Sequence, residues 1–272
     1  MSLLDVQDLT IRFGRRVVVD RATFAIAPGQ KLALVGESGS GKTVTALSTL
    51  RLLDAARLEG SIRFEGRDVL AMSAEELRKL RGNDIAVIFQ EPMTALNPVI
   101  TVGAQIVEAI RLHRDVPAVR ARELAIEGLR SVGVTEPARR VDSYPHQLSG
   151  GQRQRAMIAM ALACEPRLLI ADEPTTALDV SIRHQILDLL DKIRRERNLA
   201  ILMITHDLNL VRRFADRVAV MEKGVLVEQG TTAEVMGAPR HAYTRKLIDS
   251  RAEREVGEPG QGCLLEGRDV RV

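Results

Sequence analysis

Short apolar runs alternate with longer amphipathic stretches along most of the chain. Apolar runs that end at Gly, Pro or Asp indicate β-strands, and apolar residues three or four positions apart indicate helices. Strands are predicted at Leu3–Phe13, Val17–Ile26, Lys31–Val35, Gly60–Phe64, Ile85–Phe89, Leu168–Ala171, Ala200–Thr205, Val218–Met221 and Val225–Glu228. Helices are predicted at Lys42–Leu53, Val102–Leu112, Val119–Val132, Gly151–Cys164, Ser181–Arg197 and Leu208–Phe214. Strands that alternate with helices predict an α/β fold with a mostly parallel, helix-covered sheet.

Two regions depart from this alternation. At the start, Leu3–Phe13 alternates and ends at Gly14, as an edge strand would, and Val17–Ile26 follows it without a helix. These two strands predict an N-terminal antiparallel β subdomain. From about residue 93 to 165 the periodicity is helical and prolines punctuate it, which predicts an inserted helical subdomain. The main domain is expected to span residues 1–250, and the Gly-rich, charged residues 251–272 are expected to form a poorly ordered tail.

Composition and charge exclude several classes of protein. The 272 residues carry a net charge of +3, and the acidic and basic residues are mixed along the chain rather than gathered in one block. With five Phe, two Tyr and no Trp, the chain lacks the aromatic side chains that stack on bases, so no nucleic-acid partner is expected. The two cysteines, Cys164 and Cys263, form no CxxC pair, so neither a disulfide framework nor a zinc site is expected, and Cys164 is predicted to be a small core residue.

The chain shows neither a targeting segment nor a membrane span in its pattern. The first residues have no basic stretch followed by an apolar one, so no signal peptide is expected. The longest run without charge, Pro92–Val107, contains prolines and polar residues, whereas a membrane helix needs about 20 mostly apolar residues. A soluble protein is therefore expected, and any role at a membrane would require a partner.

A glycine-rich segment separates the predicted strand Lys31–Val35 from the helix after it. Glycines let consecutive amides curl around phosphates, and the helix start adds donors and positive potential. Lys42 can reach the β- and γ-phosphates of a nucleotide, and the Thr43 hydroxyl can ligate Mg²⁺. The segment predicts a nucleotide site of the P-loop type, which several classes of protein share. It fits the pattern G-x-x-x-x-G-K-[ST] and reads Gly36-Glu37-Ser38-Gly39-Ser40-Gly41-Lys42-Thr43.

Three further motifs follow the glycine-rich segment in order. They are Leu148-Ser149-Gly150-Gly151-Gln152 before an apolar helix, the strand ending Asp172-Glu173-Pro174, and Ile204-Thr205-His206-Asp207 at the end of another strand. The set resembles the nucleotide-binding subunits of ABC transporters, from Leu3 to about Leu247. The resemblance implies a P-loop NTPase fold that binds and hydrolyses ATP with Mg²⁺.

The signature Leu148–Gln152 has two interpretations. Taken alone, Ser149-Gly150-Gly151 could simply be a helix start capped by a serine. That interpretation is favoured for the motif by itself, but its amides and hydroxyl could also bind an anion, which would give the chain a second phosphate site. The resemblance implies that two subunits pair head to tail. The signature of one, with Ser149, Gly150, Gly151 and Gln152, then closes over the γ-phosphate held by the P-loop of the other.

The resemblance also implies roles for residues after the strands. Asp172, on a strand expected beside the P-loop strand, would hold Mg²⁺ through its water shell. Glu173 would be the general base that polarises the attacking water, and His206 would contact the γ-phosphate and orient that water. The other histidines are read as structural: His113, His146, His184 and His241.

Three more residues gain roles from the resemblance. Gln90 matches a glutamine that contacts Mg²⁺ and water and senses the membrane partner. Asp179 matches an aspartate that crosses the interface between subunits. Phe13 matches an aromatic residue that stacks on adenine, although a core phenylalanine is the competing interpretation.

Two stretches narrow the resemblance to one group of importers. Phe89–Pro98 and Pro239–Leu247 look like segments of the oligopeptide, dipeptide and nickel importers. No C-terminal cysteine cluster accompanies them, so no iron–sulfur site is expected. The resemblance implies two membrane permeases, an extracytoplasmic substrate-binding protein and a second ATPase subunit, with a heterodimer favoured over a homodimer. It also implies a peripheral location at the cytoplasmic face of the inner membrane.

Non-transport functions are the alternatives. DNA-repair members of the family insert long coiled coils, and translation members fuse two cassettes, whereas this chain has one P-loop and no sustained heptads. Subunits that act in phosphonate breakdown have similar cassettes, but the intact stretch from Glu91 to Pro98 favours an importer.

Overall fold

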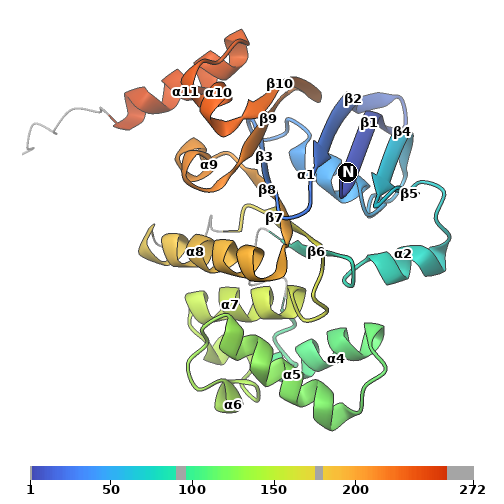
Figure 1. Ribbon diagram of the computed structural model, residues 1–272, viewed down its shortest axis with the longest axis vertical. Helices are drawn as coiled ribbons and strands as arrows, with labels where there is room; N and C mark the ends of the chain where they lie inside the picture. Colours follow the sequence, from blue (N-terminus) through green and yellow to red (C-terminus); the bar gives the residue numbers. More distant parts are fainter. Residues whose placement is uncertain (1, 90–95, 175–179, 256–272) are drawn as a thin grey trace, which may run out of the picture.

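The computed structural model describes residues 2–89, 96–174 and 180–255 and contains two sheets, with helices around them (Figure 1). The antiparallel sheet has the order β2-β1-β4-β5. Its strands are β1 (Leu4–Phe13), β2 (Arg16–Ile26), β4 (Ala56–Phe64) and β5 (Arg67–Asp68). The second sheet has the order β10-β9-β3-β8-β7-β6, and all its strands are parallel except β10. These strands are β3 (Lys31–Val35), β6 (Ile85–Ile88), β7 (Leu168–Asp172), β8 (Ala200–Thr205), β9 (Arg217–Glu222) and β10 (Val225–Thr231).

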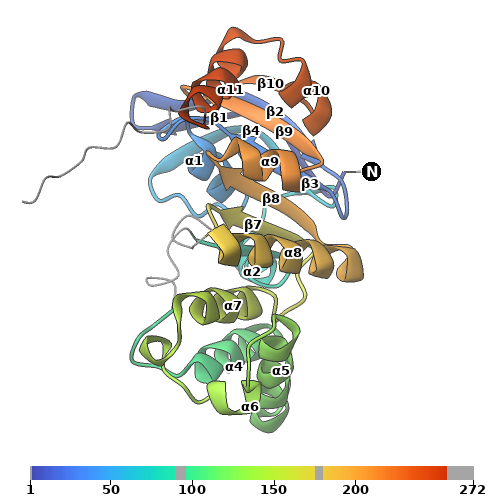
Figure 2. The ribbon, with the colours of Figure 1, turned by 90° about the vertical axis from the view of Figure 1, so that its left-hand side faces the viewer.

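The helices cover the parallel sheet and form a separate group beyond it. They are α1 (Lys42–Ser48), α2 (Ala74–Leu80), α4 (Val102–His113), α5 (Ala118–Ser131), α6 (Pro137–Arg140), the 3-10 turn η1 (Pro145–Gln147), α7 (Gly150–Ala161), α8 (Val180–Arg197), α9 (Leu208–Phe214), α10 (Thr232–Gly237) and α11 (Ala242–Glu255). Figures 1 and 2 both place α4 to α7 at one end of the molecule, beyond α8. The predicted α/β class, with an antiparallel β subdomain and an inserted helical subdomain, is confirmed. The predicted limits of the domains, 1–250 and about 93–165, stay predictions.

The prediction that the first strand lies at a sheet edge is wrong. β1 is an inner strand, because Leu4 pairs with Ile26 of β2 on one side and with Phe64 of β4 on the other. The alternation of apolar and polar residues indicates which face of a strand is buried. It does not indicate whether the strand's backbone is hydrogen-bonded on one side or on both.

The strand that ends at Asp172 does not lie beside the P-loop strand as expected. β8 separates the two, since its residue Ile201 pairs with Lys31 of β3 and with Leu169 of β7. The order of strands depends on how each crossover connection passes over the sheet. The apolar periodicity of the sequence does not indicate that path.

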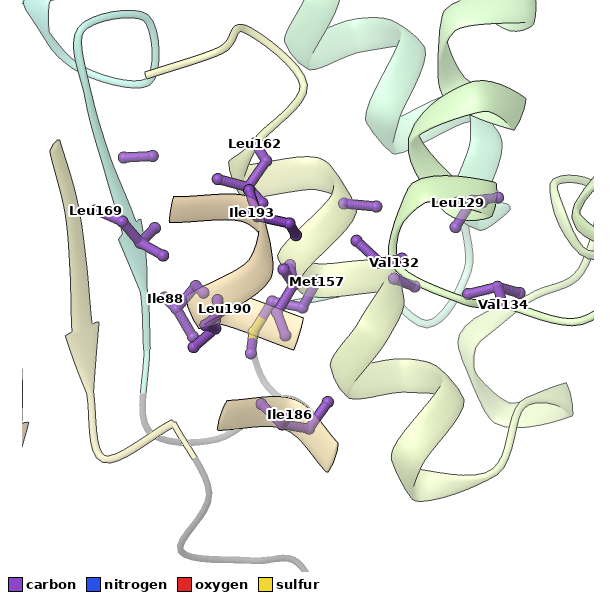
Figure 3. Packing of buried hydrophobic residues seen from close by; sticks show 14 of the residues in the cluster. Ile88, Leu129, Val132, Val134, Met157, Leu162, Leu169, Ile186, Leu190 and Ile193 are labelled. Atoms are coloured by element: carbon purple, nitrogen blue, oxygen red, sulfur yellow. The ribbon is translucent and has the colours of Figure 1, made fainter. Parts of the chain in front are cut away.

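Alternation within the central strands divides the core between two faces. Leu168 and Ile170 of β7 face the antiparallel sheet and α1, whereas Leu169 between them faces the helical side. Successive side chains of a strand point to opposite faces, so one apolar strand supplies both cores. Figure 3 shows the helical side, where Leu190 and Ile193 of α8 lie beside Met157 of α7 and Leu162, the residue that follows this helix.

Several short elements differ from the predicted ranges. α1 ends at Ser48, before the predicted end at Leu53, and the chain continues in turns. The seven-residue helix α2 was not predicted, although Ser73 and Glu76 form a capping box at its start. Helix α11 continues to Glu255, five residues into the predicted tail; residues 256–272 lie outside the described part.

Cys164 is buried, and its Sγ lies 3.6 Å from the carbonyl oxygen of Ala109, as predicted for a core residue. Burial raises the pKa of this thiol.

Among the described residues no helix is long and apolar enough to cross a bilayer.

A charged cluster ties α8 to the start of the P-loop strand. Lys31 Nζ on β3 lies 2.8 Å from Asp191 Oδ1 on α8 and 4.9 Å from the centre of the Phe214 ring. Arg194 and Arg195 also donate hydrogen bonds to the Asp191 carboxylate. Burial alone would raise the pKa of Asp191, but these hydrogen bonds outweigh it and lower that pKa from 3.8 to about 2.

We expect Asp191→Asn to lower the free energy of unfolding at pH 7 by about 2 kcal/mol, the value that corresponds to this pKa difference. Because the pKa is depressed in the folded state, the stabilisation is complete above about pH 5 and falls to roughly half by pH 3. Urea unfolding of both proteins between pH 3 and 7 measures the difference. Asp188→Asn is the control, since Asp188 forms an exposed ion pair with Arg213 on α9. A loss as small as that of the control at pH 7 would contradict the prediction.

Candidate nucleotide site

The glycine-rich segment connects β3 to α1 at the carboxyl end of the parallel sheet. Two glycines are required by its path. Gly36 has φ +154°, and a Cβ there would lie 2.2 Å from the carbonyl oxygen of Met221. Gly41 has φ +101° and stands immediately before the helix. Within the described residues the amides of Gly39 and Gly41 donate to no protein acceptor, so they remain available to an anion.

Lys42 begins α1, and its ammonium group folds back over the loop. Its Nζ donates to the carbonyl oxygens of Gly36 at 2.9 Å and Glu37 at 2.8 Å, with Ser40 Oγ at 3.4 Å. Burial lowers the pKa of Lys42, and the carboxylates of Glu173 and Asp172 partly offset that effect. The loop therefore holds a buried cation beside two acidic side chains.

Thr43 and Asp172 meet although 129 positions separate them in the sequence. The Thr43 hydroxyl donates a hydrogen bond to Asp172 Oδ2 at 2.8 Å. Burial raises the pKa of Asp172, while the bond from Thr43 and the charge of Lys42 lower it. A hydroxyl and a carboxylate are the oxygen ligands that Mg²⁺ prefers.

No three His, Cys, Asp or Glu side chains of the described residues gather closely enough to hold a metal. Mg²⁺ commonly keeps several waters and is bound by one or two side chains plus substrate phosphates, so the Thr43 and Asp172 oxygens fit that ion.

Glu173 and His206 lie side by side at the ends of neighbouring strands. His206 Nδ1 is 2.6 Å from Glu173 Oε1. Glu173 has φ +45°, a conformation that L-residues rarely adopt, and its amide donates to the carbonyl oxygen of Ile204 at 2.9 Å. Backbone strain of this kind costs about 1–3 kcal/mol and is concentrated at functional sites. The turn aims the Glu173 side chain at His206.

The segment that carries His206 is fixed by the next residue. Asp207 caps α9 by accepting from the amides of Asn209 and Leu210, and its own amide donates to Thr205 Oγ1. Arg183 on α8 donates to the second Asp207 oxygen at 3.0 Å. These contacts hold His206 between β8 and α9.

A cavity of about 450 Å³ lies between the glycine-rich loop and the pair Asp172 and Glu173. Phe13 lines the cavity and is partly buried against the core of the antiparallel sheet, so its position fits both the stacking and the core interpretation. The cavity places the basic loop and the acidic pair on one open surface. Its lining consists of Phe13, Arg16, Val18, Ser38, Gly39, Gly41, Lys42, Thr43, Val44, Asp172, Glu173 and Ile204.

The signature lies apart from this cavity. Ser149 caps α7 in a capping box: its Oγ accepts from the Gln152 amide, and Gln152 Oε1 accepts from the Ser149 amide. Ser149 and Gly150 are exposed, and a Cβ on Gly150 would meet nothing within 4 Å. None of the described residues that line the cavity belongs to Leu148–Gln152. The structure thus brings together the loop and the acidic pair but not the signature.

Gln90 and Asp179 lie outside the described residues, as does most of the stretch 89–98. Of the histidines predicted to be structural, three have neighbours that fit. His146 stacks on Tyr144, His113 lies near Gly82, and His241 accepts a hydrogen bond from the Tyr243 amide.

Two residues beside the site were missed by the sequence motifs. Gln154 is almost fully buried on α7 and donates to the carbonyl oxygen of Pro174 at 2.6 Å, directly after Glu173. The Tyr243 hydroxyl accepts from the amide of Glu37 in the loop. Gln154 could have been found from the sequence, because it is a polar residue among the apolar positions of a predicted helix. Nothing local indicated the second, since 206 positions separate its partners.

A family model described as "ABC transporter" matches residues 19–176. The chain is 50% identical to the peptidoglycan transport ATP-binding protein YejF of Agrobacterium fabrum over 99% of its own length and 51% of that protein. It is 44% identical to the dipeptide transport ATP-binding protein DppD of Haemophilus influenzae, covering 98% of the chain and 88% of that protein. The chain therefore spans about half the length of YejF but most of DppD.

A solved structure gives the same fold. The dimeric post-hydrolysis state of the ATP-binding cassette MJ0796, bound to ADP and Pi, aligns with a TM-score of 0.73 at 28% identity. The alignment covers 84% of this chain and 98% of that one.

Proposed function

The chain belongs to the ABC transporter family, and from that premise we propose that it is the ATP-hydrolysing subunit of a peptide importer. The observation that carries the proposal is the cavity in which Lys42, the Thr43–Asp172 pair and Glu173 meet. The loop amides, as hydrogen-bond donors, and the Lys42 cation suit a triphosphate, and Glu173 beside His206 suits a water molecule.

Each residue has a separate task in hydrolysis. Lys42 and the loop amides bind the phosphates and neutralise charge that develops on them. Glu173 accepts the proton of the attacking water, and His206, held 2.6 Å from it, orients that water toward the γ-phosphate. Thr43 and Asp172 would hold Mg²⁺, which supplies charge neutralisation of the phosphate oxygens when bound. Phe13, which lines the cavity, would stack on the adenine.

The complete site requires a second subunit. At the exposed start of α7, the amides of Gly150 and Gly151 have no acceptors among the described residues, whereas the Ser149 amide donates to Gln152. Such a start favours an anion, yet its own chain brings no phosphate site to it. Head-to-tail pairing would place it over the γ-phosphate of the partner, and the dimeric state of MJ0796 supports this arrangement. Gln90 would contact Mg²⁺ and the permease, and Asp179 would cross the interface.

The transport setting follows from the relatives. YejF and DppD are named for the transport of peptidoglycan and dipeptides, so a peptide cargo is proposed for this chain, with nickel as the alternative that the sequence leaves open. The chain would bind two permeases and a second ATPase subunit at the cytoplasmic face of the membrane. A substrate-binding protein would deliver the cargo on the other side. A non-transport role in phosphonate metabolism has no observation in its favour.

We expect loss of the chain to abolish uptake of a radiolabelled tripeptide by its host cells. The wild-type gene should restore uptake, whereas Glu173→Gln should not, because the variant can bind ATP but cannot hydrolyse it. Nickel uptake, measured in the same strains, should not change. Unchanged peptide uptake together with lost nickel uptake would replace peptides by nickel as the cargo, and no change in either would contradict the importer proposal.

A further inference from the structure

The C-terminal segment Pro239–Leu247 reaches the phosphate loop through one side chain. The hydroxyl oxygen of Tyr243, at the start of α11, lies 3.1 Å from the amide nitrogen of Glu37 and accepts its hydrogen bond. Tyr243 is 9% exposed, and burial raises the pKa of its phenol, so the hydroxyl stays neutral. The proposed steps of ATP hydrolysis give this segment no task.

The Tyr243 ring packs on the strand that leads into the loop. Its cluster contains Ala33 and Val35 of β3 and Val218 and Val220 of β9, the neighbouring strand. The apolar ring is therefore fixed against the sheet while its hydroxyl extends to the second residue of the loop. A hydroxyl at the end of a rigid buried ring is held in place at little entropic cost, because Tyr has only two side-chain torsions to fix.

The position of Tyr243 is fixed by contacts at the helix start. The Glu228 carboxylate on β10 accepts from the amides of Arg240 at 2.7 Å and His241 at 3.0 Å. His241 Nδ1 accepts from the Tyr243 amide at 3.2 Å. Arg245 closes the turn by donating to the carbonyl oxygens of Pro239 and Arg240. The segment thus anchors the first turn of α11 to the sheet.

The amide that Tyr243 accepts from belongs to the peptide group between Gly36 and Glu37. The carbonyl oxygen of this same peptide group is Gly36 O, which accepts from Lys42 Nζ at 2.9 Å. The peptide plane is rigid, so a contact that fixes its N–H also fixes its C=O. Tyr243 therefore orients the group that holds the Lys42 ammonium.

We propose that Tyr243 is a positioning residue of the nucleotide site, and that Pro239–Leu247 holds the phosphate loop in its binding conformation through the Tyr243 hydroxyl. The proposal rests on the proposed binding of ATP by the loop. It assigns a task to a motif near the C-terminal end of the described chain, on a helix that contributes no residue to the cavity lining among those described.

Tyr243→Phe tests the proposal because it removes only the hydroxyl and keeps the ring in its cluster. We expect the dissociation constant of ATP, measured by calorimetry, to rise roughly five- to tenfold, since the Glu37 amide loses its acceptor and the loop gains other conformations. Ile248→Val is the matched control: Ile248 packs on the same cluster from the same helix, and the change removes one methylene without touching the loop. It should lower the unfolding temperature and leave the affinity for ATP unchanged.

The chain offers a direct probe of the contact, because it contains only two tyrosines, Tyr144 and Tyr243. With tyrosine labelled at Cζ with ¹³C, the spectrum should contain two signals, and Tyr144→Phe assigns the one from Tyr243. Saturating MgADP should shift the Tyr243 signal.

The outcomes separate the proposals. Wild-type affinity in Tyr243→Phe, equal weakening in Ile248→Val, or a Tyr243 signal that MgADP leaves unchanged would overturn the positioning role and leave the proposed ATPase function intact. A wild-type chain that binds no ATP would overturn both.

Discussion

Glu173→Gln should lower the rate of ATP hydrolysis by roughly 10²–10⁴-fold, the usual contribution of a general base. Glutamine keeps the size of the side chain and can still contact His206, but its amide cannot accept the proton of the attacking water. Binding of ATP should persist, because Lys42 and the loop amides are untouched. With binding intact and hydrolysis stopped, the ATP-bound dimer should accumulate. Phosphate release measures the rate, and size-exclusion chromatography in ATP measures the dimer.

Glu136→Gln is the matched control for this prediction. Glu136 also has a positive φ, of +50°, and it stands exposed at the start of α6. The control should hydrolyse ATP at the wild-type rate and show no excess of dimer. Normal turnover by Glu173→Gln would remove Glu173 as the base, and a loss of ATP binding would show that the substitution disturbed the loop instead.

Ser149→Arg should lower hydrolysis by roughly 10²–10³-fold, the usual effect of removing a donor to charge that develops in the transition state. The substitution places a long cation at the exposed start of α7, where head-to-tail pairing would bring the partner's γ-phosphate. It should block closure while the P-loop of the same chain still binds ATP. Calorimetry measures that binding, and phosphate release measures the activity.

Loss of the helix cap is a competing explanation for such an effect, since removing a capping serine costs about 0.5–2 kcal/mol. Ser73→Arg separates the two explanations. Ser73 forms the same capping box with Glu76 at the start of α2, and it does not line the cavity. The control should lose stability without losing activity. Wild-type hydrolysis by Ser149→Arg would contradict the composite site.

Local pattern predicted the elements well where a strand is buried and bounded by turn residues. β3 and β8 begin and end at the predicted residues. In both strands, turn residues on either side of a continuous apolar run mark where the strand starts and ends. Short elements without such runs were missed, as α2 shows. Seven residues contain too few apolar positions for helical periodicity to stand out, although the Ser73–Glu76 capping box was present in the sequence.

The sequence predicted which residues belong to the candidate site better than it predicted how they are arranged in space. The loop, Asp172, Glu173 and His206 were all identified from motifs, and the structure places them at the ends of β3, β7 and β8. The expectation that the strand ending at Asp172 lies next to β3 was wrong, because β8, which ends just before His206, lies there instead. The contacts of Tyr243 and Gln154 could not be predicted, since each joins segments that no local pattern connects.

For the signature Leu148–Gln152, the sequence alone did not determine which other parts of the site it meets. By itself the sequence determined the phosphate loop, the acidic strand end and a capped helix start, because each is a local pattern of backbone freedom, charge and apolar spacing. Only the tertiary structure decided which of them meet. It joined the first two in one cavity and left the third exposed, since the order of strands and the packing of helices are fixed by long-range burial that no short segment encodes.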